Sequence, residues 1–252
     1  MPINRNTKAA LRKRFPKAWN TLRTASLGLK LAPRLFGHYP RSCNICGFEG
    51  KFLAEIHFPD IFTFDAMCPK CGSLPRNRLL MLGISERQFV TGNDRMLHFA
   101  PEPCITNRLR ALAKEYVTAD LDPAGVDRQE NIEALSFADN SWDVIFCSHV
   151  LEHVDHHKAL AELYRALVPG GKLLAFFPIV EGWTGDYENP DVKSEHLRGI
   201  HFGKSNHLRR FGRDVRKAFE QSGFKLENYV VDGKTTVQHG LIPGEVLFVA
   251  TK

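Results

Sequence analysis

Short apolar runs alternate with helical stretches from about residue 90 to the end of the chain. Alternation of this kind predicts a mostly parallel sheet with helices on both faces, an α/β fold of the doubly wound type. In such sheets ligands bind at the carboxyl ends of the strands, where the strand order reverses. We expect strands near residues 96–100, 116–120, 143–148, 172–180, 226–231 and 245–250, and helices near residues 101–114, 149–167 and 213–222.

A different pattern occupies the first 41 residues. Leu11, Phe15, Trp19 and Leu22 are spaced four, four and three apart, which predicts an amphipathic helix that Pro16 either kinks or restarts. This segment holds ten Lys or Arg and no Asp or Glu. This segment either packs on the rest of the protein or forms a frayed basic tail, or it lies on an anionic membrane surface or on RNA phosphates. An organelle transit peptide has the same composition.

Composition points to a globular protein. The 252 residues are 43% hydrophobic and 25% charged, with no membrane-length apolar run and no secretory signal, so we expect a cytoplasmic location. Peripheral membrane contact through residues 1–41 stays open. The net charge of +6 is uneven, because the first 41 residues contribute +10 and the rest, with 24 basic and 28 acidic residues, contributes −4. The mildly acidic body does not favour nucleic acid as a partner.

Four cysteines form two tight pairs. Cys43 and Cys46 make the first, Cys68 and Cys71 the second, and a glycine follows each pair. Two such turns supply the four thiolates of a tetrahedral site, and structural zinc is the favoured occupant. Iron in the same cage and two disulfides are the alternatives, although nothing in the sequence indicates secretion.

One acidic residue suggests a nucleoside cofactor. Asp120 closes the second predicted strand twenty residues after Ala100, where a carboxylate can accept hydrogen bonds from both ribose hydroxyls. The first loop reads Ala100-Pro101-Glu102-Pro103 and lacks the glycines that admit a pyrophosphate. Because S-adenosylmethionine has no phosphate and carries a sulfonium and an ammonium group, Glu102 suits it better than a dinucleotide.

From about residue 68 onwards these features resemble a known family. The matching stretches are CPKCGSLPRNRLL, LHFAPEP, VTADLD, NIEALSFADNSWDVIFCSHVLEHV, LYRALVPGGKLL and HFGKSNHLRRFGRD. They are similar to a bacterial family of class I S-adenosylmethionine-dependent methyltransferases that carry a zinc-ribbon-like four-cysteine segment in front. The resemblance implies a seven-stranded Rossmann-like sheet of order 3-2-1-4-5-7-6 with one antiparallel strand. The chain then divides into a basic arm (1–41), the four-cysteine segment (42–75) and the methyltransferase domain (76–252).

The resemblance also implies where the cofactor binds. Its positions are Phe99, Ala100, Pro101 and Glu102 for the methionine part, Asp120 and Leu121 for the ribose, Asn131 and Ile132 for the adenine, and Ser148 near the methyl group. The family commonly has Asp where this chain has Asn131, and an amide can still hydrogen-bond the adenine edge.

Methyl transfer from a sulfonium gains mostly from positioning and from exclusion of water, but an alcohol acceptor also needs a base. His149, after the fourth strand, is the first candidate; His153 is expected in a packing role, and His156 and His157 on the solvated side of the helix. Residues 181–213 are too long for a connector, so they form either a lid over the acceptor or a solvated basic loop. The candidate catalytic residues are His149, His201 and His207, and the candidate substrate-binding residues are Tyr187, Arg198 and Arg209.

The fourth strand ends in Cys-Ser-His-Val at 147–150, not in the Asn-Pro-Pro-Tyr or Asp-Pro-Pro-Tyr that cradles an amine. We therefore expect a methyltransferase that acts on a small molecule or saccharide, at oxygen. Two alternatives remain: an RNA methyltransferase that binds RNA through the four-cysteine segment and arm, and a non-catalytic module that binds S-adenosylmethionine.

Overall fold

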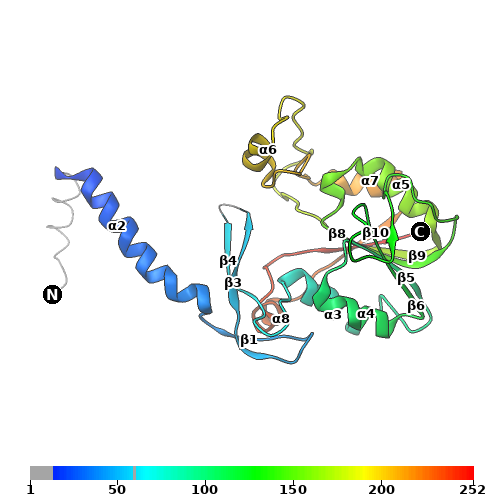
Figure 1. Cartoon of the computed structure of the whole chain (residues 1–252), viewed down its shortest axis with the longest axis horizontal. Coiled ribbons are helices and arrows are strands. Elements are labelled where there is room, and N and C mark those ends of the chain that lie inside the picture. The colour runs from blue at the N-terminus through cyan, green and yellow to red at the C-terminus, as the bar shows by residue number, and fades with distance from the viewer. Residues whose placement is uncertain (1–13, 59–60) are drawn as a thin grey trace.

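A seven-stranded mixed sheet organises the computed structural model, which describes residues 14–58 and 61–252 (Figure 1). Its spatial order is β7-β6-β5-β8-β9-β11-β10, and β11 runs opposite to the other six strands. Counted along the chain this is 3-2-1-4-5-7-6, so the expected fold is confirmed. The strands are β5 (Arg95–Phe99), β6 (Glu115–Asp120), β7 (Arg128–Gln129), β8 (Trp142–Ser148), β9 (Leu167–Phe176), β10 (Lys225–Tyr229) and β11 (Leu247–Thr251).

The sheet is buried on both faces because successive side chains of its central strands enter different cores. Met96 and Val144 belong to one hydrophobic cluster, and their neighbours Leu97 and Ile145 belong to the other. This two-sided burial is typical of parallel strands covered by helices. The first cluster includes residues of α3 (Pro75–Arg87) and α4 (Pro103–Leu112), and the second includes residues of α5 (His156–Ala166) and α7 (Val215–Gln221).

The helix expected over 149–167 is wrong in its first part. Residues Leu151–His153 form a separate 3-10 turn, and α5 begins only at His156. Asp155 causes this start, because its carboxylate accepts hydrogen bonds from the backbone N–H groups of His157 and Lys158. The residues between β8 and α5 therefore form a loop, and side chains of this loop can point across the end of the sheet.

The four-cysteine segment consists of two hairpins, β1 (Pro40–Ser42) with β2 (Glu49–Lys51) and β3 (Leu53–Phe58) with β4 (Ile61–Met67). It shares a core with the sheet, since Cys43, Phe52 and Cys68 belong to the same cluster as Met96. Arg78 on α3 connects the four-cysteine segment to the end of α8 (Gly233–His239). Its buried guanidinium donates hydrogen bonds to the backbone carbonyls of Ala66, Ser73, His239 and Gly240, the last two at the end of α8. The domain boundary at residue 76 stays a prediction.

The basic arm forms α2 (Pro16–Leu31), followed by a 3-10 turn over Ala32–Phe36. Pro16 occupies the first turn, so it starts this helix, while Leu11 lies outside the described residues. The helix projects away from the sheet in Figure 1, and Phe15, Leu22 and Leu29 are 52%, 68% and 79% exposed. The expectation that it packs on the body is therefore wrong for its described part. Among residues 14–58 and 61–252, no helix is long and apolar enough to span a membrane.

Ala100 adopts a backbone conformation that favours glycine. Its φ is +51°, in the left-handed region, at the turn between β5 and α4. A Cβ in this region costs about 1 kcal/mol, which explains why a glycine is usual in loops of this kind.

We expect Ala100→Gly to raise the free energy of unfolding by about 1 kcal/mol, because glycine removes this strain. Urea unfolding would measure the change. Ala111→Gly is the matched control, since Ala111 is exposed within α4 and glycine there should lower stability by about 0.5–1 kcal/mol. An equal loss of stability in both variants would show that Ala100 is not strained.

Candidate functional site

A groove lies where the carboxyl ends of β5 and β6 meet. Ala100, Pro101, Pro103, Asp120 and the 122–126 loop line it. Asp120 is half-buried, and its Oδ1 accepts a hydrogen bond from the backbone N–H of Asp122 at 3.1 Å. Leu121 follows at 67% exposure, on the outer side of this edge. The structure thus brings Asp120 and the Ala100 loop to one groove, as the sequence predicts.

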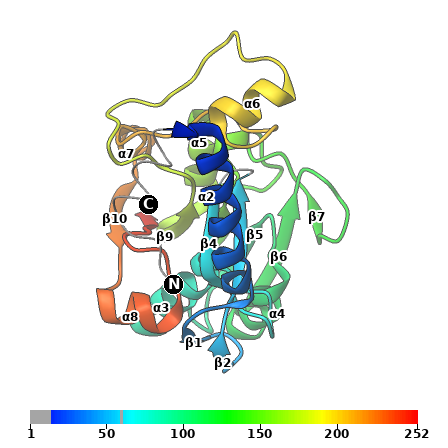
Figure 2. The ribbon, with the colours of Figure 1, turned by 90° about the vertical axis from the view of Figure 1, so that its left-hand side faces the viewer.

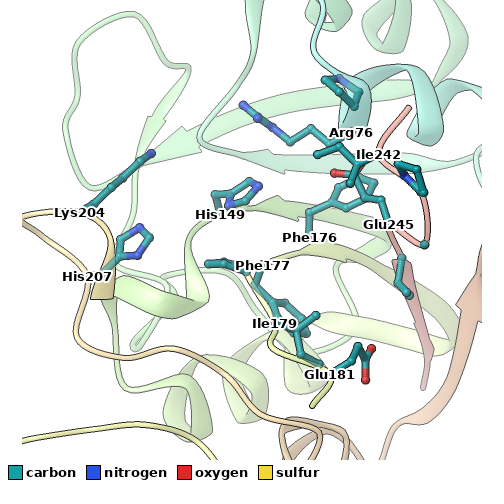
Figure 3. Close-up of a pocket in the computed structure, with 15 residues that line it drawn as sticks. Arg76, His149, Phe176, Phe177, Ile179, Glu181, Lys204, His207, Ile242 and Glu245 are labelled. Carbon is teal, nitrogen blue, oxygen red and sulfur yellow. The ribbon is translucent and has the colours of Figure 1, made fainter. Parts of the chain in front are cut away.

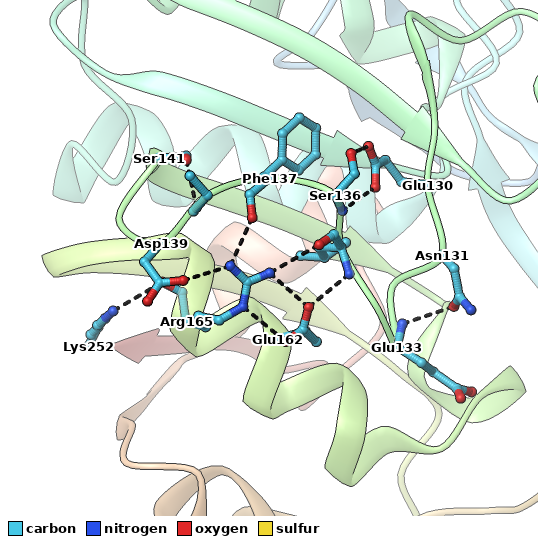
Figure 4. A network of polar contacts seen from close by, with 12 residues as sticks. Glu130, Asn131, Glu133, Ser136, Phe137, Asp139, Ser141, Glu162, Arg165 and Lys252 are labelled. Carbon is cyan, nitrogen blue, oxygen red and sulfur yellow. Dashed lines mark hydrogen bonds and ion pairs between the residues drawn. The ribbon is translucent and has the colours of Figure 1, made fainter.

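The segment predicted to border the adenine follows directly. The backbone N–H of Glu130 donates to the carbonyl of Asp120 at 2.9 Å, which places residue 130 beside the groove. Asn131 is exposed and its side chain accepts a hydrogen bond from the N–H of Glu133, while Ile132 is buried (Figure 4). Arg165 on α5 fixes the rest of this segment by donating to Glu162, Asp139 and the carbonyls of Leu135 and Phe137.

The donor set at this edge fits S-adenosylmethionine. Phe99 and Ser148 are buried at the ends of neighbouring strands β5 and β8. Glu102 Oε2 and Ser148 Oγ are buried, and neither has a hydrogen-bond partner among the described residues. Such atoms are costly unless a bound group satisfies them, and an amino acid ammonium is a suitable donor.

Arg76 on α3 is a site residue that the sequence analysis missed. Its guanidinium contacts Glu102 Oε1 at 2.6 Å, so the charge of Glu102 is already compensated. Arg76 also lines a neighbouring cavity of about 380 Å³. A largely buried cation beside the Ala100 loop is a suitable partner for the cofactor's carboxylate.

The cavity adjoins the end of β8 and is walled largely by apolar side chains. Figure 3 shows His149 projecting into it, with Phe176 and Phe177 nearby, Lys204 and His207 on one side, and Arg76 and Glu245 on the other. Burial raises the pKa of Glu245 to about 7. A cavity of this size, apolar with a few polar groups, is typical of a small-molecule site.

A backbone hydrogen bond and a contact with Glu152 fix the orientation of His149. Its φ is +54° and its backbone N–H donates to the carbonyl of Phe176, which turns the side chain toward the cavity. Its Nδ1 lies 3.0 Å from Oε1 of Glu152, whose side chain is fully buried. Burial acts to raise the pKa of Glu152, but the hydrogen bond and charge of His149 outweigh it and leave this pKa below its ordinary value. A carboxylate at Nδ1 leaves Nε2 as the basic nitrogen, the arrangement of a general base.

The lid brings fewer of the candidate residues to the cavity than the sequence analysis expected. Residues 181–213, with α6 (Glu195–Phe202), arch over one end of the sheet in Figure 2. Of the candidate catalytic and substrate-binding residues in the lid only His207 lines the cavity of Figure 3, together with Glu181 and Lys204 of the same segment. The Tyr187 hydroxyl pairs with Nδ1 of His201 at 2.6 Å, and Arg198 lies in a separate hollow beside Arg209.

Two basic residues are buried instead of solvated. Arg209 is 7% exposed, and its guanidinium donates to Glu188 and to the backbone carbonyls of Leu151 and Val154. His156 is 5% exposed because it packs edge-on against Phe211 of the lid. The expectation of a solvated His156 is therefore wrong, and burial lowers its pKa to about 4. His157 is exposed, as expected.

The four cysteines meet in one cluster. Cys43 Sγ lies 3.7 Å from Cys71 Sγ, and Cys46 Sγ lies 3.6 Å from Cys68 Sγ. Zinc bonds of about 2.3 Å in a tetrahedron place sulfur atoms about 3.8 Å apart, so the donor set fits such an ion. Burial acts to raise the pKa of Cys43, but hydrogen bonds from Ser73 and from the backbone of Cys46 and Ile45 lower it to about 7. All six cysteines are free, so the disulfide alternative is wrong for this structure.

Known proteins match the central part of the chain. Residues 103–175 match the family model described as a methyltransferase domain. The ubiquinone/menaquinone biosynthesis C-methyltransferase UbiE of Klebsiella pneumoniae is 47% identical over 73 residues, 27% of this chain and 28% of that protein. UbiE of Escherichia coli O1:K1 is 45% identical over 64 residues, 24% of this chain and 26% of that protein. The chain thus aligns with little more than a quarter of the length of these curated relatives.

A solved structure with a similar outline is the YcgJ protein from Bacillus subtilis, at 16% identity and a TM-score of 0.46, covering 69% of this chain and 96% of that one. The family match and the observed strand order agree with the resemblance that the sequence motifs carry. Residues 103–175 are thus similar to a methyltransferase domain, and the strand order is the one that the resemblance implies.

Proposed function

We propose, from the premise that residues 103–175 form such a methyltransferase domain, that the chain transfers a methyl group to a hydroxyl oxygen of a small molecule or saccharide. The observation that supports an oxygen acceptor is the pair of His149 and buried Glu152 beside the cavity. A positioned base is needed for an alcohol but not for a nucleophile that is already deprotonated. The cavity volume of about 380 Å³ suits a single ring or sugar unit.

Residues of the groove would hold the cofactor. Asp120 would accept hydrogen bonds from the ribose hydroxyls, Arg76 would pair with the carboxylate, and Glu102 would pair with the ammonium group. When bound, S-adenosylmethionine supplies a methyl group that is activated by its sulfonium. The chain's own contribution is to orient this group toward the cavity and to exclude water with Phe176 and Phe177.

His149 would then move one proton. Its Nε2 would take the proton of the acceptor hydroxyl as the methyl group passes from the sulfonium to the hydroxyl oxygen, which would leave a neutral thioether. Glu152 stabilises the resulting imidazolium through Nδ1, and the proton afterwards passes to solvent. Lys204, on the same cavity wall, suits an anionic acceptor such as a phosphorylated or carboxylated sugar.

The acceptor atom can be tested with S-adenosylmethionine that carries a ¹³C-methyl group. The full chain is incubated with this cofactor and with fractionated metabolite extracts, and the product is read by NMR. The proposal expects an O–¹³CH3 signal that the wild type forms and His149→Gln does not. A C–CH3 or N–CH3 product, or methylated RNA, would overturn the oxygen acceptor, and cofactor binding without product in any fraction would favour the non-catalytic module.

For the four-cysteine cluster we propose structural zinc, because four thiolates at tetrahedral spacing leave no position for water or substrate. Arg78 supports this assignment. Burial lowers the pKa of Arg78 to about 10, and the negative charge of Cys43, Cys68 and Cys71 opposes that shift. The guanidinium thus offsets part of the net charge of a zinc–tetrathiolate centre.

For the arm we propose contact with an anionic membrane surface. Phe15, Trp19, Leu22 and Leu29 follow one stripe of α2, and Arg23 and Lys30 flank it. No acidic residue interrupts the arm, and the stripe is largely exposed. An uncovered apolar stripe with basic flanks is typical of a helix that lies in the plane of a membrane interface.

We expect the full chain to sediment with vesicles that contain phosphatidylserine and to stay in solution with neutral vesicles. Leu22→Glu should weaken this binding at least tenfold, because it places a charge in the apolar stripe. Thr24→Glu adds the same charge on the opposite face and should weaken binding much less. Equal loss in both variants would reduce the contact to charge alone, and binding to RNA but not to vesicles would contradict it.

A further inference from the structure

Three metal-ligating side chains converge beside the cavity, in a group separate from the four cysteines. One ligand atom from each of Glu152, His153 and His207 lies within 4.8 Å of the other two. Oε1 of Glu152 is 3.9 Å from Nε2 of His207, and these side chains are 0% and 1% exposed. Burying polar groups this deeply is costly unless each is paired, and one cation can satisfy several of them at once.

The cluster lies where two distant segments are joined. The backbone N–H of Leu208 donates to the carbonyl of Glu152 at 2.9 Å, and the guanidinium of Arg209 donates to the carbonyls of Leu151 and Val154. Hydrogen bonds to main-chain carbonyls of the loop after β8 therefore hold this loop and the lid together. This gives the three side chains a rigid frame, which a binding site requires.

Both histidines are oriented in the same manner. Nδ1 of His153 lies 3.1 Å from the carbonyl of Asn206, and Nδ1 of His207 lies 3.1 Å from the carbonyl of Phe202. Because a carbonyl only accepts, each Nδ1 carries the proton and each Nε2 carries the lone pair. Metal-bound histidines almost always donate their other ring N–H to such a carbonyl or to a carboxylate.

Glu152 supplies an independent indication of a ligand. Its Oε1 accepts a hydrogen bond from His149, whereas its buried Oε2 has no hydrogen-bond partner among the described residues. An unsatisfied carboxylate oxygen in the interior is strongly unfavourable, and a cation is the group that would satisfy it.

We propose that Glu152, His153 and His207 bind a divalent transition metal ion, zinc or manganese, as a two-histidine, one-carboxylate site. Such sites leave coordination positions open for water or substrate. Bonds of about 2.1 Å place tetrahedral ligands about 3.4 Å apart, so binding draws these atoms inward by a small side-chain movement. Because His207 also lines the cavity, an open position would meet an oxygen of the molecule held there. The site does not rest on the proposed methyl transfer, since metal binding needs neither cofactor nor acceptor.

The experiment measures metal stoichiometry on the full chain. After equilibration with zinc and removal of loose ions, elemental analysis is expected to give two zinc ions per chain. His207→Ala and His153→Ala should each retain one, and Cys43→Ser should retain the other. His157→Ala removes an exposed histidine from the start of α5 and should retain both.

Manganese separates the two sites, because thiolates bind it poorly. The protein is first treated with a mild chelator until one zinc ion per chain remains, in the four-cysteine cluster, and Mn²⁺ binding is then followed by the loss of the free-ion electron paramagnetic resonance signal. One Mn²⁺ is expected to bind per chain, and His207→Gln should weaken this binding at least tenfold. The proposal would be overturned if the wild-type chain bound one zinc ion and no Mn²⁺. It would also be overturned if a second metal ion persisted in both His153→Ala and His207→Ala, and the use of two variants keeps this test valid when one of them misfolds.

Discussion

Replacing Cys43 by serine should release the ion of the four-cysteine cluster and destabilise the chain by several kcal/mol. This loss of stability is smaller than the ~10–16 kcal/mol that zinc contributes to small zinc-dependent folds, because the sheet keeps its own core. The effect should nevertheless reach beyond residues 42–75. Cys43 and Cys68 share a hydrophobic cluster with strand residues of the sheet, and Arg78 connects the segment to α8.

Elemental analysis and thermal unfolding would follow the two consequences. Cys104→Ser is the matched control, because Cys104 is partly buried but lies outside the cluster. It should keep the cluster ion and change the melting temperature little. If Cys43→Ser kept both its full metal content and its stability, the four-cysteine site would be refuted.

Replacing His149 by glutamine should lower turnover by about 10²- to 10⁴-fold while cofactor binding stays unchanged. Glutamine keeps a hydrogen bond to Glu152 but cannot take a proton at neutral pH. The rise of rate with pH that reports a base should therefore disappear. Glu152→Gln should also slow turnover, because an amide stabilises the imidazolium less well than a carboxylate does.

Steady-state kinetics over a pH series would measure both changes, and calorimetry would show that the cofactor still binds. His157→Gln, on the exposed side of α5, should leave the rate and its pH profile as in the wild type. Turnover within threefold of wild type in His149→Gln, with the same pH profile, would assign the proton transfer to another group.

The features that could be predicted from sequence are those set by local chemistry. The apolar runs at the strands, the cysteine pairs and Asp120 at the end of β6 each depend on a few adjacent residues. The cysteine pairs and Asp120 occupy the predicted places, whereas β9 begins at Leu167 and ends at Phe176 instead of spanning residues 172–180. The seven-strand order came from the family resemblance, since periodicity alone does not fix the order of strands.

Features that depend on distant partners were missed. Arg76 and Arg78 belong to one short helix turn, but their partners lie 26 and more than 160 residues away. Arg209 carries a charge that suggests exposure, yet its acceptors include carbonyls of the loop after β8. The sequence analysis missed the pair of His149 and Glu152 because it expected one continuous helix, whereas Leu151–His153 form a separate turn before Asp155 starts α5.

The central claim is that the groove at the ends of β5 and β6 binds S-adenosylmethionine through Asp120. Isothermal titration of the wild-type chain with S-adenosylhomocysteine tests it directly. We expect one site per chain, a loss of roughly 1–3 kcal/mol of binding free energy in Asp120→Ala, and little change in Glu115→Ala at the opposite end of the same strand. No binding by the wild type, or equal affinity in Asp120→Ala, would contradict the claim.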